Sequence, residues 1–422
     1  MALRNVLFFL IFSSFETSVM GQIRIDVPEP GGAGLPIAIS PLEPLGGKGM
    51  QRLGEEFADV IARDLDLSGL FRPIDRSAYL EGPEGRRLED IKFQNWTAIG
   101  ALAVAKGGFW LEGDDLTVEV RLFDVAQQKQ LGGKRYRGER ADMRRIAHRF
   151  ADQIMLFFTG ELGPFSSKIA FVSNRGGRRA KELFITDLTG TDIVQVTRDR
   201  GINLGPSWNP QGTALTYLSY KQGGPYPFRL DLTSGQSSRL HSMVGYSSRW
   251  SPDGSMVAVS MEQQGNVDLY LLSVSGQMIR RLTESADIDI SPAWSPDSRH
   301  IAFCSNRGGK PQIYVMDVDR GNIRRLTFKG DYNTSPSWSP KGERIAYTSR
   351  AGGFHIMTIG VGGGDPQEIA AGEDPTWSPD GRYLVFSSRG RLRLASKDGL
   401  SIKQLTGGGG DDTSPAWSAR LE

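Results

Sequence analysis

Residues 291–298 read Ser-Pro-Ala-Trp-Ser-Pro-Asp-Ser, and variants of this phrase recur throughout the second half of the chain. Each is followed by an apolar run such as Ile301-Ala302-Phe303 and then by a second run such as Ile313 to Met316. The tryptophans of the phrases lie 39 to 44 residues apart, the length of one four-stranded blade of a β-propeller. They are Trp208, Trp250, Trp294, Trp338, Trp377 and Trp417.

The residues around each tryptophan suit an inner strand and a tight turn. Ser-Pro-Asp-Gly, as at residues 251–254, favours a turn because Pro presets φ and Gly accepts positive φ. A proline stands two positions before the tryptophan in five repeats, and Ser248 replaces it in the other. Because proline removes a ladder hydrogen bond, we expect the strand to begin there and to lie at a sheet edge. We expect the tryptophans to pack between blades; stacking on a sugar is the alternative.

The two ends of the repeat region complete each other. The sequence given reaches residue 422 just after the sixth tryptophan, without a following Ile-Ala-Phe strand. Residues 169–173 form such a strand with no tryptophan phrase before it. Pairing these stretches would close the ring and remove two exposed sheet edges. The sequence therefore predicts an all-β, six-bladed propeller over residues 164–422, closed by one C-terminal and three N-terminal strands.

The first part of the chain predicts an exported protein with a small α/β domain. Residues 1–21 resemble a signal peptide, with Arg4, an apolar stretch and small residues before Gln22. No later segment is long enough to span a bilayer, and the single cysteine, Cys304, lies far downstream. Within 22–163, strands are expected at 36–39, 101–105, 117–125 and 130–138, and amphipathic helices at 49–67 and 143–158, forming a mixed sheet covered by two helices.

Motifs for catalysis or cofactor binding are missing from the sequence. It contains no Gly-x-Ser-x-Gly elbow and no His-Glu-x-x-His site, and the four histidines have no ligand-like spacing. We interpret them as isolated surface or strand residues. The stretches 46–49 and 407–410 favour flexible loops over phosphate loops, and Cys304 favours a packed, inert thiol. With a net charge of +2, nucleic acid is an unexpected partner, and we predict no enzyme, cofactor or metal.

Asn and Asp recur five positions before the tryptophan, on the loop that leads into the inner strand. They are Asn203, Asp289, Asn333 and Asp412. One interpretation is that they cap these turns through their own backbone. The other is a polar, acidic rim at the channel mouth that receives a protein loop or a cation. Because the linker enters at the second strand of a blade, we expect the first domain to attach on the opposite, turn-bearing face.

The chain resembles the TolB family of periplasmic Tol-Pal components over its whole length. The resemblance rests on Gln22-Ile23-Arg24-Ile25-Asp26-Val27, the strand 36–39, the helix exit at 64–71 and the repeats ending in Ser414-Pro415-Ala416-Trp417-Ser418. It implies a non-enzymatic protein of a Gram-negative periplasm that supports outer-membrane integrity and constriction at cell division. Its implied partners are the lipoprotein Pal, bound at the channel face, and TolA, bound by the segment 22–33, with the two events coupled.

Carried onto this sequence, the resemblance assigns two sets of binding residues. The Pal surface would include Asn203, Tyr246, Asp289, Ile290, Asn333, Thr334, Asp374 and Asp412. The TolA segment would include Gln22, Ile23, Arg24, Ile25, Asp26 and Val27. Ile23, Ile25 and Val27 alternate as in a strand, which favours either addition to a partner's sheet or completion of the chain's own domain.

Two other functional classes stay open at this stage. One is an exported propeller that binds or degrades carbohydrate, which would need channel-facing aromatics and paired acid/base groups. The other is the propeller of a prolyl-peptidase-like hydrolase, which would need the missing elbow motif. We expect a monomer before complex formation, since a closed ring leaves no edge strand that asks for a partner.

Overall fold

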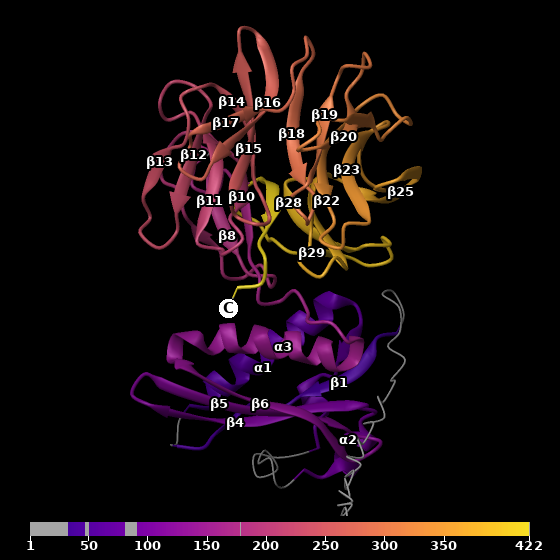
Figure 1. The fold of residues 1–422 in the computed structure, drawn as a ribbon. Helices are drawn as coiled ribbons and strands as arrows, with labels where there is room; N and C mark the ends of the chain where they lie inside the picture. The colour runs from indigo at the N-terminus through magenta and orange to yellow at the C-terminus, as the bar shows by residue number, and fades with distance from the viewer. Residues whose placement is uncertain (1–32, 47–49, 81–90, 178, 422) are drawn as a thin grey trace, which may run out of the picture.

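The computed structural model describes residues 33–46, 50–80, 91–177 and 179–421. They form an α/β domain and a β-propeller that lie one above the other, with the C-terminus between them (Figure 1). Within the described residues, no helix has the length and apolar character needed to cross a membrane. The predicted fold class, including the number of blades, is confirmed.

The sheet of the first domain has the order β3-β1-β4-β5-β6, with β2 paired to β4. The pairs of β1 with β3 and β4 are parallel, whereas β4, β5 and β6 form an antiparallel meander. The strands are β1 (Leu35–Ile39), β2 (Glu43–Pro44), β3 (Phe71–Pro73), β4 (Ala103–Glu112), β5 (Asp115–Asp124) and β6 (Lys129–Glu139). The helices are α1 (Gln51–Ser68), α2 (Phe93–Ala98) and α3 (Met143–Thr159), with short 3-10 turns at Arg76–Ala78 and Arg140–Asp142.

The sequence located most of these elements closely, but one strand differs in extent and three short elements, among them β2, were not predicted. β4 begins at Ala103 and continues to Glu112, well beyond the predicted 101–105. The strand β3 and the short helix α2 were not predicted. α1 ends at Gly69, which adopts φ +69°, the left-handed conformation that glycine accepts without strain.

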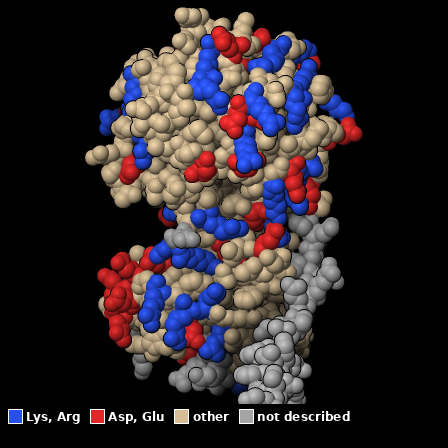
Figure 2. Space-filling model, viewed as in Figure 1, with Lys and Arg blue, Asp and Glu red and all other residues tan. Residues whose placement is uncertain are grey.

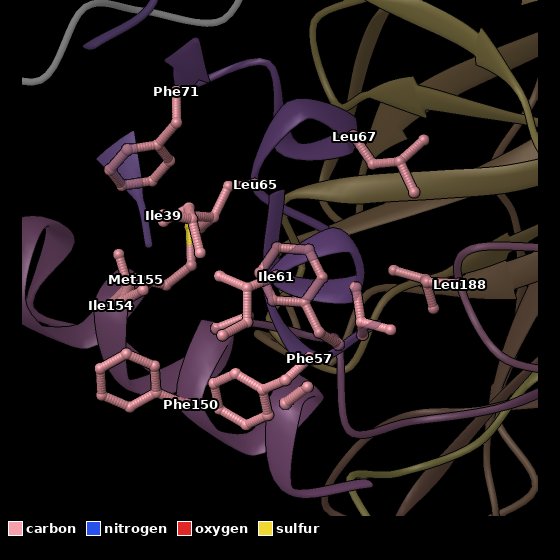
Figure 3. Packing of buried hydrophobic residues seen from close by; sticks show 14 of the residues in the cluster. Ile39, Phe57, Ile61, Leu65, Leu67, Phe71, Phe150, Ile154, Met155 and Leu188 are labelled. Carbon is pink, nitrogen blue, oxygen red and sulfur yellow. The ribbon is translucent and has the colours of Figure 1, made fainter. Parts of the chain in front are cut away.

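Both faces of this sheet are covered by apolar side chains. α1 and α3 pack on one face through residues such as Phe57, Ile61 and Phe150 (Figure 3). On the other face, Trp96 of α2 is buried with Val104 and Phe123. Each fully buried side chain of this size contributes about 1.5–3 kcal/mol, so the two layers account for the stability of the domain.

The propeller consists of six antiparallel four-stranded sheets arranged in a ring. Blade 1 contains β10 (Asn203–Trp208), β11 (Ala214–Ser219), β12 (Tyr226–Asp231) and β13 (Ser237–Arg239). Blade 2 contains β14 (Gly245–Trp250), β15 (Met256–Gln263), β16 (Asn266–Ser273) and β17 (Met278–Arg281). Blade 3 contains β18 (Asp289–Trp294), β19 (His300–Ser305), β20 (Gln312–Asp317) and β21 (Ile323–Arg325).

The remaining blades follow the same pattern, from the innermost strand A to the outermost strand D. Blade 4 contains β22 (Asn333–Trp338), β23 (Arg344–Arg350), β24 (Phe354–Gly360) and β25 (Gly363–Ala371). Blade 5 contains β26 (Glu373–Trp377), β27 (Tyr383–Ser388), β28 (Arg391–Ser396) and β29 (Ile402–Gln404). Blade 6 contains β30 (Asp412–Trp417), β7 (Ile169–Ser173), β8 (Glu182–Thr186) and β9 (Val194–Gln195).

Blade 6 closes the ring as the sequence predicts. β30 pairs antiparallel with β7, in a register that places Asp412 opposite Ser173 and Trp417 opposite Ile169. The Trp417 indole also donates a hydrogen bond of 2.6 Å to the hydroxyl of Ser167. Strands almost 250 residues apart in the sequence therefore share one sheet, and no inner strand is left without its neighbour.

The inner strands differ from the prediction in where they begin. They are edge strands, as expected, but blades 1, 3, 4 and 6 start them three residues before the proline. A β-bulge accommodates the proline, and the residue before it adopts positive φ, as at Ser291 (φ 56°) and Ser414 (φ 48°). Because a bulge leaves one residue outside the ladder, the missing N–H of proline costs no pairing there.

The tryptophans lie between blades, as predicted. Five are buried and Trp338 is partly buried. Three of them donate their indole N–H to a backbone oxygen of the preceding blade, as Trp294 does to Arg249 at 3.1 Å. The burial of five of the six side chains between blades favours this packing role over stacking on a sugar.

Candidate interaction surfaces

The two ends of the propeller carry different loops. The A–B and C–D turns face the α/β domain, whereas the B–C and D–A loops lie at the opposite end, where the β15–β16 hairpin projects away from that domain (Figure 1). The predicted attachment of the first domain to the turn-bearing face is confirmed. We call the two ends the closed face and the open face.

The four Asn and Asp residues of the predicted rim are not exposed at the open face. Asn203, Asp289, Asn333 and Asp412 are the first residues of their inner strands and are fully buried. The two aspartates bond to side chains of their own blade, and the two asparagines bond to side chains of the preceding blade. The Asp412 carboxylate accepts two hydrogen bonds of 2.6 Å from Arg175, and that of Asp289 accepts one of 2.7 Å from Arg307.

The two asparagines bond to side chains of the preceding blade in the ring. The Asn203 amide donates to Glu182 at 2.8 Å, and the Asn333 amide donates to Gln312 at 2.9 Å. The interpretation as caps of their own turns is therefore also incomplete, because these four partners lie outside the loops that lead into the inner strands. What the four residues do is anchor the D–A loops and fix the position of the residue just before each of them.

The other four residues carried over from the resemblance are more accessible. Tyr246 is 45% exposed, and its hydroxyl donates a hydrogen bond of 2.7 Å to Glu262. Ile290 and Thr334 are half-buried in their inner strands. The carboxylate of Asp374 accepts hydrogen bonds from Ser335 at 2.9 Å and Ser414 at 3.0 Å, and it lines the central channel. The structure thus divides the eight residues into buried anchors and accessible groups.

An arc of exposed apolar side chains on the open face was not anticipated. All of its members lie on B–C or D–A loops, or at the ends of strands next to them, in blades 1 to 4. The arc consists of Ile202, Tyr220, Tyr246, Ile288, Phe328 and Phe354. Phe328 is the most exposed, at 72%. Ile202 and Ile288 directly precede the anchors Asn203 and Asp289, so the sequence contained a usable signal.

A cavity of about 590 Å³ runs along the ring axis. Inner strands of all six blades line it, from Leu204, Leu218 and Tyr246 at the open face to prolines of the A–B turns at the closed face. Among the described lining residues, Arg249 of blade 2 and Asp374 of blade 5 are the two that carry charge. Most of the others are serines, prolines, tryptophans and small residues.

The closed face is joined to the α/β domain by a buried ionic cluster. His148 of α3 lies between two carboxylates, with Nδ1 2.6 Å from Asp64 of α1 and Nε2 3.4 Å from Asp187 of the β8–β9 turn. Arg144 donates to the same Asp187 oxygen at 2.9 Å. Burial alone would lower the pKa of His148, but the two carboxylates raise it to about 10. The imidazole is therefore charged at neutral pH and donates to both domains.

The interpretation of His148 as an isolated surface or strand residue is wrong. It is buried on a helix, and its partners are 84 and 39 residues away in the sequence, so no local spacing could reveal them. The other three histidines are partly exposed; His300 and His355 lie in strands, and His241 follows one. Cys304 is buried in β19 as predicted, and burial raises the pKa of its thiol to about 11.

Further polar contacts surround this cluster. The Tyr383 hydroxyl donates to the carbonyl of Ser68 at 3.0 Å, and Arg63 donates to that of Thr189 at 2.9 Å. Glu161 pairs with Lys341 at 2.8 Å and with Arg382 at 3.2 Å. Side chains of both signs gather where the two domains meet (Figure 2). The domains are thus held in one arrangement by groups from the turns of several blades.

The remaining predictions concern a metal site and the first residues of the chain. No group of three His, Cys, Asp or Glu side chains suited to a metal ion occurs in that part of the chain. The predicted signal peptide, residues 1–21, and the segment from Gln22 to Val27 lie outside the described residues, as do residues 47–49 of the first glycine-rich stretch.

These features define a class: an α/β domain fixed by a buried interface to one end of a six-bladed propeller whose other end is open. Two family models match the chain, the TolB amino-terminal domain over residues 23–131 and the TolB beta propeller domain over residues 157–421. The chain therefore belongs to the TolB family.

Similar proteins carry the same family name. A Tol-Pal system protein TolB of Desulfosudis oleivorans is 35% identical over 60% of this chain and 58% of its own length. One of Syntrophotalea carbinolica is 40% identical over 45% of this chain and 44% of its own length. The matches thus span less than two thirds of these curated relatives. The crystal structure of TolB from Acinetobacter baumannii, 27% identical, matches 92% of this chain and 97% of its own with a TM-score of 0.80.

Proposed function

We propose that this chain is a non-enzymatic periplasmic component of a Tol-Pal system that binds the lipoprotein Pal on its open face. Membership of the TolB family and the names of the curated relatives support this role. The single observation that carries it is the arc of exposed apolar side chains on the open face. In this proposal the chain also binds TolA through residues 22–33 and thereby supports outer-membrane integrity and constriction at cell division.

The composition of the arc favours a protein partner. Aromatic side chains are enriched in the centres of protein interfaces, and Tyr220, Tyr246, Phe328 and Phe354 supply four of them. Arg325 stacks over the Phe328 ring at 4.9 Å, which holds an otherwise free side chain in place before docking. A surface that is ordered in advance loses less conformational entropy when a partner binds.

This proposal revises the roles of the predicted Pal residues. Tyr246, Ile290, Thr334 and Asp374 remain candidates for contact or for shaping the channel mouth. The anchors Asn203, Asp289, Asn333 and Asp412 act through the loops, because their buried side chains hold neighbours such as Ile202 and Ile288 in position. Substituting an anchor would therefore disturb the surface without removing a direct contact.

Binding of the full chain to a soluble Pal domain tests the proposal by titration calorimetry. Phe328→Ser and Ile288→Ser should each weaken binding by tenfold or more, on the order of 1.4 kcal/mol or above, because they remove apolar anchors. Ile279→Ser is the matched control, since Ile279 is 53% exposed but lies on the outer strand β17. Equal losses in all three variants, or no loss in the first two, would contradict the proposed surface.

The TolA part of the proposal needs a separate measurement. Deleting residues 22–27 should abolish retention of TolA and leave the affinity for Pal within about twofold if the two surfaces are independent in the absence of TolA. Retention of TolA by the deleted chain would overturn this assignment and leave the open-face assignment untouched.

A further inference from the structure

The axial cavity contains one long cationic side chain, Arg249. It stands directly before the tryptophan of blade 2, a position at which every other blade carries a small residue. Those residues are Ser207, Ala293, Ser337, Thr376 and Ala416. Nothing in the repeat requires an arginine there, since the turn and the tryptophan packing are complete in blades that have serine or alanine.

The Arg249 guanidinium lacks a close anionic partner. It can donate five hydrogen bonds, and the one observed runs from Nη1 to the backbone oxygen of Ser248 at 3.0 Å. Within the described chain, no carboxylate lies within the 4.0 Å of an ion pair with it. Burial lowers the pKa of Arg249, and the charge of Asp374 across the ring only partly opposes this. A buried charge without a partner is costly, so such a group invites an anion.

Asp374 supplies the opposite charge from the other side of the cavity. It belongs to blade 5, three blades away from blade 2 around the ring. Its backbone adopts φ 55°, which is strained for a non-glycine residue, and the hydroxyls of Ser335 and Ser414 hold its two carboxylate oxygens. The carboxylate is thereby held in place in the cavity wall by two hydroxyl groups.

We propose that the channel is a binding site for a small zwitterionic molecule, such as an amino acid or a short peptide. Its carboxylate pairs with Arg249 in the two-pronged geometry that guanidinium favours, and its ammonium group faces Asp374. A volume of about 590 Å³ lies within the usual range for small-molecule sites. A multiply charged anion such as phosphate is disfavoured, because Asp374 repels it.

The ligand reaches this site from the open face. Leu204, Leu218 and Tyr246 line that end of the cavity, and Tyr246 is 45% exposed, whereas the other end meets the α/β domain. The inference does not rest on the proposed docking of Pal, because it uses only the residues of the channel.

Titration calorimetry on the full chain tests the site with glycylglycine as the probe. Acetate and ethylammonium serve as the two halves of the probe, and inorganic phosphate serves as the purely anionic comparison. Glycylglycine should bind more tightly than any of the three. Arg249→Gln should weaken its binding by about tenfold or more, the effect of losing a charge-assisted hydrogen bond, and Asp374→Asn should weaken it less.

Controls keep the test interpretable. Arg280→Gln, which removes an arginine of the outer strand β17, should leave binding unchanged. If Arg249→Gln does not fold, Arg249→Lys takes its place. Lysine keeps the positive charge but lacks the paired donors of the guanidinium, so this variant should lose part of the affinity for glycylglycine. Absence of glycylglycine binding, equal binding by wild type and a folded Arg249 variant, or binding of acetate or phosphate as tight as that of the dipeptide would overturn the proposal.

Discussion

The closed and open faces of the propeller are built from the same repeat, but the closed face buries its apolar side chains and the open face exposes them. At the closed face, apolar residues of the turns and of β7, β8, β27 and β28 join those of α1 and α3 in one continuous core. Leu188, on the β8–β9 turn, belongs to the same buried cluster as Leu67 and Ile61 of α1 (Figure 3). At the open face, the loops expose Ile288, Phe328 and other apolar side chains that no described residue covers.

The contrast shows that the closed face is an interface within the chain, whereas the open face is not covered by any described residue. The closed face buries its apolar groups and pairs its charges within the chain, with His148 held between Asp64 and Asp187. The open face keeps comparable side chains in water, although their burial would be favourable. Substitutions at the closed face should therefore change stability, and substitutions at the open face should change binding.

Removing the charge at the centre of the closed face should have the largest effect. His148→Ala leaves the Asp64 carboxylate buried without its counter-charge and removes one of the two cationic partners of Asp187. Loss of one member of a buried ion pair costs about 3–5 kcal/mol, so the unfolding free energy should fall by that amount. Calorimetry should also show weaker coupling between the unfolding of the two domains, because the cluster is one of the contacts that join them.

An exposed ion pair at the same face provides the control. Glu161→Ala removes the partner of Lys341 and Arg382, and such surface pairs contribute only about 0–1 kcal/mol. If His148→Ala were no more destabilising than Glu161→Ala, the buried cluster would not be what fastens the closed face.

The pH dependence of stability sharpens the same comparison. The pKa of His148 is raised from 6.5 to about 10 in the folded chain. Its contribution is therefore complete below pH 6.5 and is lost as the pH rises toward 10, because the unfolded chain releases the proton first. The difference in melting temperature between wild type and His148→Gln should be largest near pH 6 and should shrink toward pH 10.

The difference between the two proteins is needed because Asp152 titrates in the same direction. Burial raises the pKa of Asp152 to about 7, so its contribution falls with rising pH over a lower range. That term is common to wild type and His148→Gln and cancels in the difference. A difference that stayed constant from pH 6 to pH 10 would show that His148 is not charged in the folded state.

The sequence predicted the propeller well because its signals are local and repeated. Six copies of one phrase determine the blade length, and the phase of the first and last copies determines the closure of the ring at β7 and β30. The bulge in the inner strand was missed because it requires positive φ at serines such as Ser291, a conformation that serine rarely adopts outside such a context.

The functional surfaces were harder to predict because burial, not residue type, distinguishes them. Asp289 and Asp412 resemble surface loop residues in the sequence, yet arginines of the same blade bury them. His148 depends on partners that only the folded chain brings together. The exposed arc could have been predicted from the sequence. An apolar residue beside an Asn or Asp of a loop, as in Ile288-Asp289, is unusual in a turn that only water contacts.

The smallest effect on stability is expected from the most exposed member of the arc. Phe328→Ala removes a ring that is 72% exposed and contacts the Arg325 guanidinium, so the unfolding free energy should change by no more than about 1 kcal/mol. Phe303→Ala is the matched comparison. It removes another phenylalanine ring, in β19 of blade 3, that is fully buried. It should lose about 3–5 kcal/mol. Urea denaturation of both variants measures the contrast; a large loss in Phe328→Ala would mean that the open face, like the closed one, is held together by the fold and is not free to receive a partner.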